Sequence, residues 1–209
     1  MGTATKFLIV IVVLVLAIGL WVMGSYNSLV SLQQATDAQW AQVENVYQRR
    51  ADLVPNLVST VSGAANFEKS TLIAVTEARA SVGKVQVSQG TAPTDPAQLA
   101  AFEQAQGQLG SALSRLLVVS EQYPDIKATA GFRDLQAQLE GTENRIAVER
   151  GRFNDAVRAY DTAIRRFPAM ILAGPFGFTS RPYFTATPGS ETPPKVKFDF
   201  NATPAPAKP

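Results

Sequence analysis

The chain has 209 residues, of which 46% are hydrophobic, and its formal net charge is +2 at pH 7. This length suits an N-terminal apolar stretch plus one domain with a real hydrophobic core, and so small a charge gives no electrostatic case for a nucleic-acid partner. The chain contains no Cys and no His, which excludes disulfides, a lipoprotein anchor, thiolate or imidazole nucleophiles, haem ligation by His and the common zinc sites.

The first predicted element covers residues 7–23, FLIVIVVLVLAIGLWVM, an apolar run without charge or Pro. A bilayer core about 30 Å thick takes roughly 17–25 such residues as a helix, and the ring of Trp21 suits the membrane interface. A cleaved secretory signal is the alternative, with Lys6 before the run and a cleavage site near residues 24–25. Signals have shorter apolar cores of ~7–15 residues, so we favour a single-pass anchor over residues 1–24. The residues that mark this span are Phe7, Leu14, Leu20, Trp21 and Met23.

The positive charges around the anchor predict its orientation. Lys6 precedes the apolar run, and no Lys or Arg follows the run until Arg49. Because positively charged flanks stay in the cytoplasm, we expect the N-terminus inside and the domain on the extracytoplasmic side of the membrane.

A more polar helix is expected from Ser25 onward. Its apolar side chains alternate at spacings of four and three, which is typical of a helix that packs on other helices. No Gly or Pro lies between Ser25 and Val54, so the membrane helix is expected to continue into this one. Pro55 removes a backbone donor and predicts a kink or a restart. The seam positions are Leu32, Thr36, Trp40, Val43, Tyr47, Arg50, Val54, Leu57 and Val61.

Two further helices are expected after a break at residues 63–66. The first has its apolar positions at Phe67, Leu72, Val75, Val82 and Val85. Residues 88–96, SQGTAPTDP, are a linker by composition, and Asp95 and Pro96 supply an N-cap and a first turn for the next helix. That helix runs to about residue 122. Its face consists of Leu99, Phe102, Leu109, Leu113, Leu116 and Leu117.

The last predicted helix is the most regular element. Residues 123–125, Tyr-Pro-Asp, end the previous helix and begin this one, which Pro168 ends about 40 residues and ~60 Å later. Its seam consists of Phe132, Leu135, Leu139, Thr142, Ile146, Glu149, Phe153, Ala156, Tyr160, Ala163 and Phe167.

Residues 167–184 form an apolar segment whose Gly and Pro exclude a spanning helix. The segment is expected either to cap the core or to return to the bilayer surface, and these two interpretations are compatible. Residues 185–209 have too few apolar side chains to fold and predict a disordered Pro-rich tail. The predicted fold is all-α: a transmembrane helix that continues into an antiparallel up-and-down four-helix bundle with long helices, over residues 25–184.

Ordered motifs run through most of the chain. They are YNSLV at 26–30, Trp40, RRADLVPNLV at 49–58, EAR at 77–79, YPDIKA at 123–128, F-x-x-LQ-x-x-LEGTENRIA at 132–147, FNDAV at 153–157, Tyr160, FP at 167–168 and RPYF at 181–184. In these motifs the chain resembles the LemA family of bacterial membrane proteins. The resemblance marks as structural or interaction residues Tyr26, Asn27, Trp40, Arg49, Arg50, Asp52, Pro55, Asn56, Tyr123, Pro124, Glu143, Asn144, Arg145, Asn154, Tyr160, Tyr183 and Phe184.

The resemblance implies a membrane helix, a helical bundle and no established enzymatic activity. A related branch of the family is associated with magnetosome membranes, which fits a membrane-organising role. This sequence departs from the family at Ala64 and Phe67, where Tyr and His are common, so a role for that His cannot apply here. It also has Phe153 and Asp161 where Tyr and Asn are usual.

The residues predict no catalytic, cofactor-binding or metal site. Ferritin-like metal sites need Glu-x-x-His pairs, and Glu140-x-x-Glu143 lacks the His. We expect Glu140, Glu143, Arg145, Glu149 and Arg150 to form local ion pairs on a solvated face. No Gly-rich phosphate loop follows a strand, and no nucleophile has a base partner.

Polar residues around Pro55 predict a hydrogen-bonded layer inside the bundle. Arg49, Arg50 and Asp52 flank the expected kink, where an Arg or the Asn56 side chain could satisfy the freed carbonyl. Asn144 and Arg145 are candidate partners across the bundle. A layer that fixes helix register is favoured over a ligand site, and a contact surface for identical subunits or another membrane protein is the functional alternative.

We therefore expect a membrane-anchored, non-enzymatic helical scaffold of the bacterial inner membrane. It would contact the lipid bilayer and form a homo-oligomer or bind another envelope protein, without a cofactor or nucleic acid. The alternative is a sensor or regulatory module that couples ligand or protease binding to the membrane helix. A hydrolase or transferase is a third class, for which no residues can be named.

Overall fold

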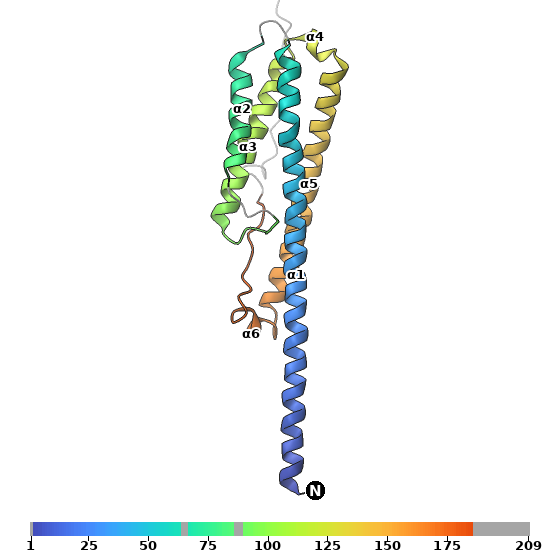
Figure 1. Ribbon diagram of the computed structural model, residues 1–209, viewed down its shortest axis with the longest axis vertical. Coiled ribbons are helices and arrows are strands. Elements are labelled where there is room, and N and C mark those ends of the chain that lie inside the picture. The colour runs from blue at the N-terminus through green and yellow to red at the C-terminus, as the bar shows by residue number, and fades with distance from the viewer. Residues whose placement is uncertain (1, 64–66, 86–89, 186–209) are drawn as a thin grey trace, which may run out of the picture.

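The computed structural model describes residues 2–63, 67–85 and 90–185, and every regular element within these ranges is a helix. The elements are α1 (Thr3–Ser62), α2 (Lys69–Lys84), α3 (Pro96–Ser120), α4 (Pro124–Lys127), α5 (Ala130–Arg165) and α6 (Met170–Ala173). Figure 1 shows a long, narrow molecule in which the first part of α1 projects alone and the rest lies beside α2, α3 and α5. The all-helical prediction is confirmed for these residues. The predicted tail lies outside them, apart from Thr185.

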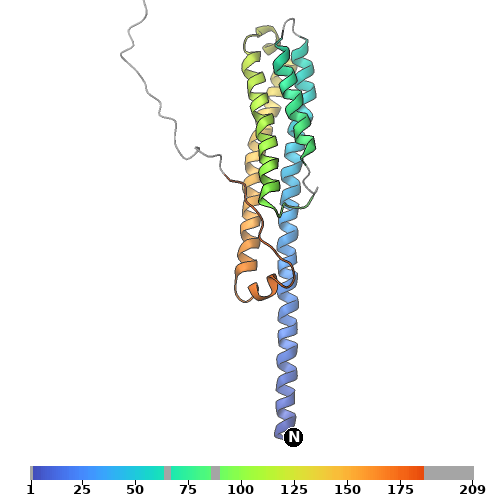
Figure 2. The same ribbon diagram turned by 90° about the vertical axis from the view of Figure 1, so that its left-hand side faces the viewer.

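Helix α1 combines the apolar run and the first helix of the domain. It is 60 residues long and has no break between the two parts, as the sequence predicts. Among the described residues it is the one helix that is long and apolar enough to cross a membrane. The side chains from Phe7 to Leu20 are exposed. Both ribbon views show the N-terminal part of α1 projecting with no other helix beside it (Figures 1 and 2).

The predicted seam of α1 is confirmed by burial. Every seam residue from Thr36 to Val61 is buried, and Leu32 is half-buried. The expected restart at Pro55 is wrong, because α1 continues through this residue to Ser62. Packing along the whole seam outweighs the loss of one backbone hydrogen bond, which a proline inside a helix costs.

The predictions for α3 are confirmed at its start and along its face. Asp95 accepts a hydrogen bond from the Ala97 amide at 2.8 Å, and Pro96 is the first helical residue. The helix ends at Ser120, close to the expected position. Its buried residues are Leu99, Phe102, Ala105, Gln106, Leu109, Leu113, Leu116 and Ser120.

Helix α5 differs from its prediction in where it begins and in which residues are buried in its second half. The Tyr-Pro-Asp stretch opens the one-turn helix α4, and α5 begins separately, with Thr129 as an N-cap that accepts from the Phe132 amide at 3.3 Å. Beyond Phe153 the buried face moves by one residue, from the predicted Ala156 and Ala163 to Val157 and Ile164. A straight helix drifts about 20° per heptad against a strict 3.5-residue repeat, so the buried position falls progressively later.

Four helices contribute to one hydrophobic cluster at the end far from the apolar run. Leu57, Val75, Leu113 and Leu139 come from α1, α2, α3 and α5 and are all buried there. Midway along the domain, the Trp40 ring meets three Phe rings: Phe102, Phe153 and Phe184. A third cluster, where α1 leaves the domain, consists of Leu29, Tyr160, Ile164, Ala173 and Phe178.

The chain after α6 turns back along the domain. We call residues 178–185 the strap, because they run beside the helices without regular structure (Figures 1 and 2). Phe178 is buried in the third cluster and Phe184 in the aromatic cluster. The predicted core-capping role of residues 167–184 is therefore confirmed for this part of the segment.

Candidate functional site

Arg50 is a buried cation in the middle of the α1 seam, with 4% of its surface exposed. Its Nη1 donates to Oε1 of Glu143 on α5 at 2.8 Å. Its Nη2 donates to the carbonyl oxygen of Gln106 on α3 at 2.9 Å and to the side-chain Oε1 of Gln106 at 2.5 Å. One guanidinium therefore joins three helices, and its planar fork suits this arrangement better than an ammonium would.

Tyr47 lies one turn before Arg50, and its ring is 5.0 Å from the Arg50 guanidinium carbon. It also meets the Phe102 ring edge-on at a centroid distance of 5.1 Å. Burial raises the pKa of the Tyr47 phenol above its usual value of 10.0, and this effect outweighs the lowering by Arg150 and Arg50. The phenol is therefore neutral at pH 7 and acts as a ring for the cation to stack on.

A second interhelical ion pair lies next to Arg50. Arg150 on α5 donates to Glu103 on α3 at 2.7 Å. Its guanidinium carbon also lies 4.5 Å from the Phe184 ring centroid. Burial raises the pKa of Glu103, and Arg150 opposes this shift. We call these residues the polar layer: Tyr47, Arg50, Glu103, Gln106, Glu143 and Arg150.

The predicted local pairing on α5 is wrong for two of its members. Glu143 and Arg150 pair with α1 and α3, whereas Glu149 does pair locally, with Arg152 at 2.8 Å. The error has a physical cause: an amphipathic pattern identifies a helix flank but not the charges that a neighbouring helix brings to it. Long Glu and Arg side chains at a flank can reach across as easily as along the helix.

The carbonyl that Pro55 leaves without its helical donor does have a partner. Proline has no N–H, so the Ala51 oxygen, four residues earlier, lacks the usual intrahelical bond. Nε of Arg79 on α2 donates to this oxygen at 3.0 Å. An Arg satisfies the carbonyl as predicted, but it comes from α2 and not from the residues flanking Pro55; Arg49, Asp52 and Asn56 are all exposed.

The strap is held by polar contacts at two places. Asn154 on α5 donates to the Phe184 carbonyl and accepts from its amide, both at 2.9 Å. Asp161 on the same helix accepts from the Ser180 hydroxyl at 2.5 Å and from the Arg181 amide at 3.2 Å. These side chains satisfy backbone and buried groups of a segment that has no sheet or helix partner.

Arg181 extends the strap's contacts to the loop before α3. Its Nη1 donates to the Ala92 carbonyl at 2.5 Å, and its Nη2 lies 3.9 Å from Oδ1 of Asp37. The same Asp37 oxygen accepts from the Ala92 amide at 2.9 Å. The strap, the loop and α1 thus meet around one buried guanidinium, which stabilises their relative positions.

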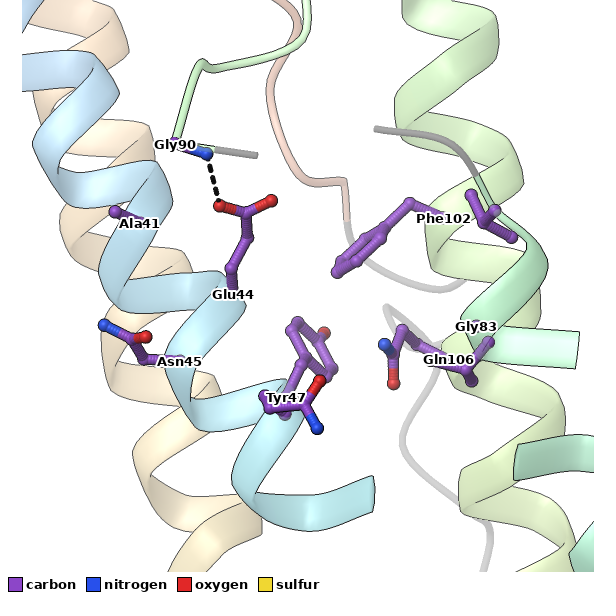
Figure 3. Close-up of a pocket in the computed structure, with 11 residues that line it drawn as sticks. Ala41, Glu44, Asn45, Tyr47, Gly83, Gly90, Phe102 and Gln106 are labelled. Atoms are coloured by element: carbon purple, nitrogen blue, oxygen red, sulfur yellow. Dashed lines mark hydrogen bonds between the residues drawn. The ribbon is translucent and has the colours of Figure 1, made fainter. Parts of the chain in front are cut away.

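Two cavities adjoin the polar layer. One has a volume of about 510 Å³ and lies between α1 and the α2–α3 side (Figure 3). Glu44, Tyr47, Phe102 and Gln106 line it, and Glu44 accepts from the Gly90 amide at 2.9 Å. The other is about 790 Å³; it shares the Tyr47 and Gln106 walls and adds the two ion pairs, Arg50 with Glu143 and Arg150 with Glu103.

The polar side chains that line these cavities can donate and accept hydrogen bonds. Glu103 and Glu143 each face an Arg within 2.8 Å, so their charges are compensated. In residues 2–63, 67–85 and 90–185, no group of three or more Asp or Glu is placed to hold a metal ion. The arrangement can hold a small polar molecule or fix the register of three helices.

The remaining predicted residues are distributed along the whole molecule. Tyr26 lies where α1 leaves the domain, 5.2 Å from Phe176 and 5.7 Å from Phe178 between ring centroids. Tyr123, at the opposite end, has its ring 5.0 Å from Phe67. Trp40 and Tyr160 are core residues, while the exposed residues include Asn27, Arg49, Pro55, Asn56, Pro124, Asn144 and Arg145. The predicted partners Asn144 and Arg145 are thus on the surface.

Sequence reasoning missed several residues that join elements, among them Gln106, Asp37 and Glu44. Gln106 occupies the seam position between Phe102 and Leu109 in α3, so the 3–4 spacing contained a signal for it. Asp37 and Glu44, which bind the loop before α3, are seven residues apart along one flank of the α1 seam, which was a second signal. Arg79 lies in the EAR motif at 77–79, but no spacing indicated that it would donate to the Ala51 carbonyl.

Comparison with known proteins finds a family match and several relatives for this chain. The model of the LemA family matches residues 39–198. Magnetosome protein MamQ 1 and MamQ 2 of Paramagnetospirillum magneticum are each 28% identical over 207 residues, covering 92% of this chain and 76% of the relative. Magnetosome protein MamQ of Magnetospirillum gryphiswaldense is 30% identical over 183 residues, covering 80% and 67%. Protein LemA of Metamycoplasma hominis is 23% identical over 167 residues, covering 79% and 72%.

Proposed function

The chain belongs to the LemA family, and on that premise we propose that it is a membrane-anchored, non-enzymatic scaffold of the bacterial cell envelope. It self-associates or binds another envelope protein through its helical domain. The observation that carries this proposal is α1, a single helix of 60 residues that supplies both the apolar run and the seam of the core. An anchored domain meets its neighbours at a raised effective concentration, so weak lateral contacts suffice.

The proposed domain architecture is an antiparallel up-and-down four-helix bundle. Its helices are α1, α2, α3 and α5, and the shared cluster of buried residues from all four supports this assignment. Arg50 supports it as well, since its contacts reach α3 and α5 from α1. In this architecture the surface helices are available for lateral contacts.

The proposed location is the inner membrane, with the N-terminus in the cytoplasm and the domain outside. Lys6 before the apolar run supports this orientation, and similarity to proteins named for the magnetosome supports a membrane setting. Because the natural chain has no Cys, Ser190→Cys provides one unique thiol. We expect an impermeant maleimide to label it in intact spheroplasts. Labelling that occurs only after lysis would contradict this orientation and place the domain in the cytoplasm.

Self-association is tested by crosslinking single-Cys variants. Ile73, Val118 and Val148 are large apolar residues exposed on α2, α3 and α5, so we substitute each with Cys in turn. We expect at least one of them to give a crosslinked dimer in native membranes, and mass measurement in mild detergent to give an oligomer or a stable complex. Lys127→Cys, at the far end of the domain, is the control. A monomeric mass without any crosslinked neighbour would contradict the scaffold. Separately, a reproducible catalytic turnover that Glu143→Gln abolishes would contradict the proposed non-enzymatic character.

A second candidate function is a sensor that couples ligand binding to the membrane helix. The observation that favours it is the cavity of about 790 Å³ with Tyr47 and Arg50 of α1 in its wall. A polar ligand there would contact the same helix that carries the apolar run. Native mass spectrometry should then find a bound small molecule that Arg50→Met releases and Arg49→Met retains. A preparation without bound ligand that still forms complexes would favour the scaffold.

A further inference from the structure

The end of the domain where α1 leaves exposes a cluster of large apolar side chains. We call it the apolar turn: Phe167, Met170, Ile171 and Phe176, which are 73%, 53%, 58% and 50% exposed. They follow α5 and flank the short α6. Elsewhere on the described surface of the domain, exposed aliphatic residues such as Ile73, Val118 and Val148 stand singly on separate helices. A contiguous apolar cluster of this kind marks a binding surface.

The apolar turn lies beside the last residues of the apolar run. Trp21, Gly24 and Ser25 of α1 line a cavity of about 570 Å³ together with Phe167 and Pro168. The Phe176 ring is 5.2 Å from the Tyr26 ring. Both views place α6 next to α1 at the point where α1 continues alone (Figures 1 and 2). The turn is therefore at the level of residues 21–29 of α1.

This level is the boundary of the bilayer if α1 spans it. The run from Phe7 to Met23 is about 25 Å long at 1.5 Å per residue, which is shorter than the ~30 Å hydrocarbon core. The core therefore extends to Trp21 and slightly beyond, and the headgroup region surrounds the following turn of helix. The cavity that Trp21 shares with Phe167 extends along residues 21–29 of α1, about 12 Å of helix, so the turn lies within that distance of Trp21 along the helix axis.

The charges near the turn suit a lipid headgroup region. Between residues 162 and 180 the sequence has Arg165 and Arg166 and no Asp or Glu, and α1 has no acidic residue before Asp37. Asp161, one turn before Arg165, is 5% exposed and lies 3.6 Å from the Arg165 guanidinium. Arg165 and Arg166 are exposed, and Arg166 lines the cavity beside Trp21. Basic residues are attracted electrostatically to anionic lipid, while apolar neighbours enter the acyl boundary.

We propose that the apolar turn inserts into the interface of the leaflet from which α1 emerges, as a second membrane contact of the domain. The occupant of this surface is lipid, because the surface is continuous with the apolar run and carries the exposed Arg165 and Arg166, while Asp161, one turn earlier in the chain, is buried and pairs with Arg165 at 3.6 Å. Two contacts, one spanning and one interfacial, fix the tilt of the domain against the bilayer, which a single helix does not. This membrane contact does not depend on whether the protein is a scaffold.

Site-directed fluorescence quenching in liposomes tests the proposal on the full chain. The natural chain has no Cys, so Ile171→Cys carries one environment-sensitive fluorophore, in phosphatidylcholine–phosphatidylglycerol vesicles that contain a headgroup or shallow-chain nitroxide lipid. Val118→Cys, on the domain surface, is the aqueous control, and Leu14→Cys marks the mid-span. We expect the Ile171 label to be blue-shifted and quenched at least twofold more than the Val118 label.

Two results would overturn the proposal. One is an Ile171 label that behaves like the Val118 label. The other is an Ile171 label that is shielded from water but not quenched by nitroxide lipid and that crosslinks between copies, which would assign the turn to a protein contact. Because nitroxide lipid is present in both leaflets, the outcome does not depend on the orientation of the chain, and it is separate from the crosslinking test of self-association.

A variant pair distinguishes insertion from indirect effects. Phe167→Ser with Phe176→Ser should reduce quenching of the Ile171 label to the level of the Val118 label without changing the helical circular dichroism. The matched control is Ile73→Ser with Val148→Ser, which should leave quenching unchanged. If the double variant does not fold, Met170→Asp, which places a charge in the turn, serves instead. Full quenching in a folded Met170→Asp variant would count against insertion.

Discussion

Arg50 shows what a buried charge requires in a helical core. A guanidinium without partners would cost several kcal/mol to bury, so its position in the seam implies groups on other helices that receive it. Gln106 and Glu143 are these groups, at sequence separations of 56 and 93 residues. The residue therefore contributes to specificity of packing, since the observed register of α1, α3 and α5 brings Gln106 and Glu143 within hydrogen-bond distance of its Nη atoms.

Replacing Arg50 with Met should destabilise the domain by about 1–3 kcal/mol, because the buried Gln106 groups lose their donor. Glu143→Gln should cost at most about 1 kcal/mol, since this carboxylate is 47% exposed. Denaturant unfolding followed by circular dichroism in detergent measures both. Arg49→Met, at the exposed neighbouring residue, is the control. Equal effects of Arg49→Met and Arg50→Met would contradict the role of the buried guanidinium.

Because the pKa of Tyr47 is raised in the folded state, we expect the domain to lose stability at alkaline pH. The folded pKa is raised above 10.0, so the folded state favours the neutral phenol more than the unfolded state does. This contribution is fully present below pH 10 and is lost as the pH rises through the folded pKa. The Tyr47→Phe variant should therefore lose less stability than the natural chain as the pH rises above 10. Denaturant midpoints measured over this pH range test this. The other tyrosines are common to both proteins, and identical profiles would refute the assignment.

At the scale of elements, α1 and α2 are joined where α1 lacks a hydrogen bond. The Ala51 carbonyl is free of a helical donor because residue 55 is Pro, and Arg79 of α2 donates to it. A hydrogen bond between two helices thus replaces the bond that is missing within α1. This helps to explain why α1 passes through Pro55 without ending.

A double-mutant cycle tests this transfer. Arg79→Met should cost about 0.5–1.5 kcal/mol in the natural chain, and clearly less in a Pro55→Ala background, because an alanine at this position would supply the missing N–H. A coupling of similar size is expected between the two changes. Strict additivity in unfolding free energies would contradict the contact. Glu77→Met, elsewhere on α2, controls for general effects of Met.

The strap depends on Asn154, which both donates to and accepts from the Phe184 backbone. Asn154→Leu should raise the exchange rate of the Phe184 amide about tenfold or more, since losing about 1.4 kcal/mol of protection is a factor of ten. Hydrogen–deuterium exchange of a peptide covering residues 178–185 measures this. Asn144→Leu, exposed on the same helix, should leave exchange unchanged. Unaltered exchange in Asn154→Leu would contradict the assigned role.

At the scale of the whole molecule, one helix sets the height of the domain above the bilayer. Seven neutral helix-forming residues inserted between Gly24 and Ser25 would raise the domain by about 10.5 Å and turn it by only about 20° from its original facing. We expect the Ile171 label to lose its quenching by shallow nitroxide lipid, while the denaturant midpoint of the domain stays the same. Retained quenching would show that the height of the turn is not set by α1.

The sequence alone determined the features that depend on local or periodic information. The apolar run, the continuity of α1, its seam from Thr36 to Val61 and the Asp95 cap follow from composition, spacing and capping chemistry. Each of these needs only residues within a few turns of one another. The family resemblance, too, rested on ordered motifs along the chain. Of the two alternatives predicted at Pro55, the restart did not occur, because packing along the seam outweighed a local penalty.

Only the tertiary structure decided which side chains meet. The partners of Arg50, the donation from Arg79 to Ala51 and the contacts of Asp161 with the strap all join different segments. A periodic pattern shows which face of a helix is buried, but it does not show which residue of a neighbour lies at the same height. That depends on helix register, on loop paths and on the drift of a straight helix against a 3.5-residue repeat. For the same reason, the level of the apolar turn beside Trp21 became known only once α5 and α1 were seen side by side.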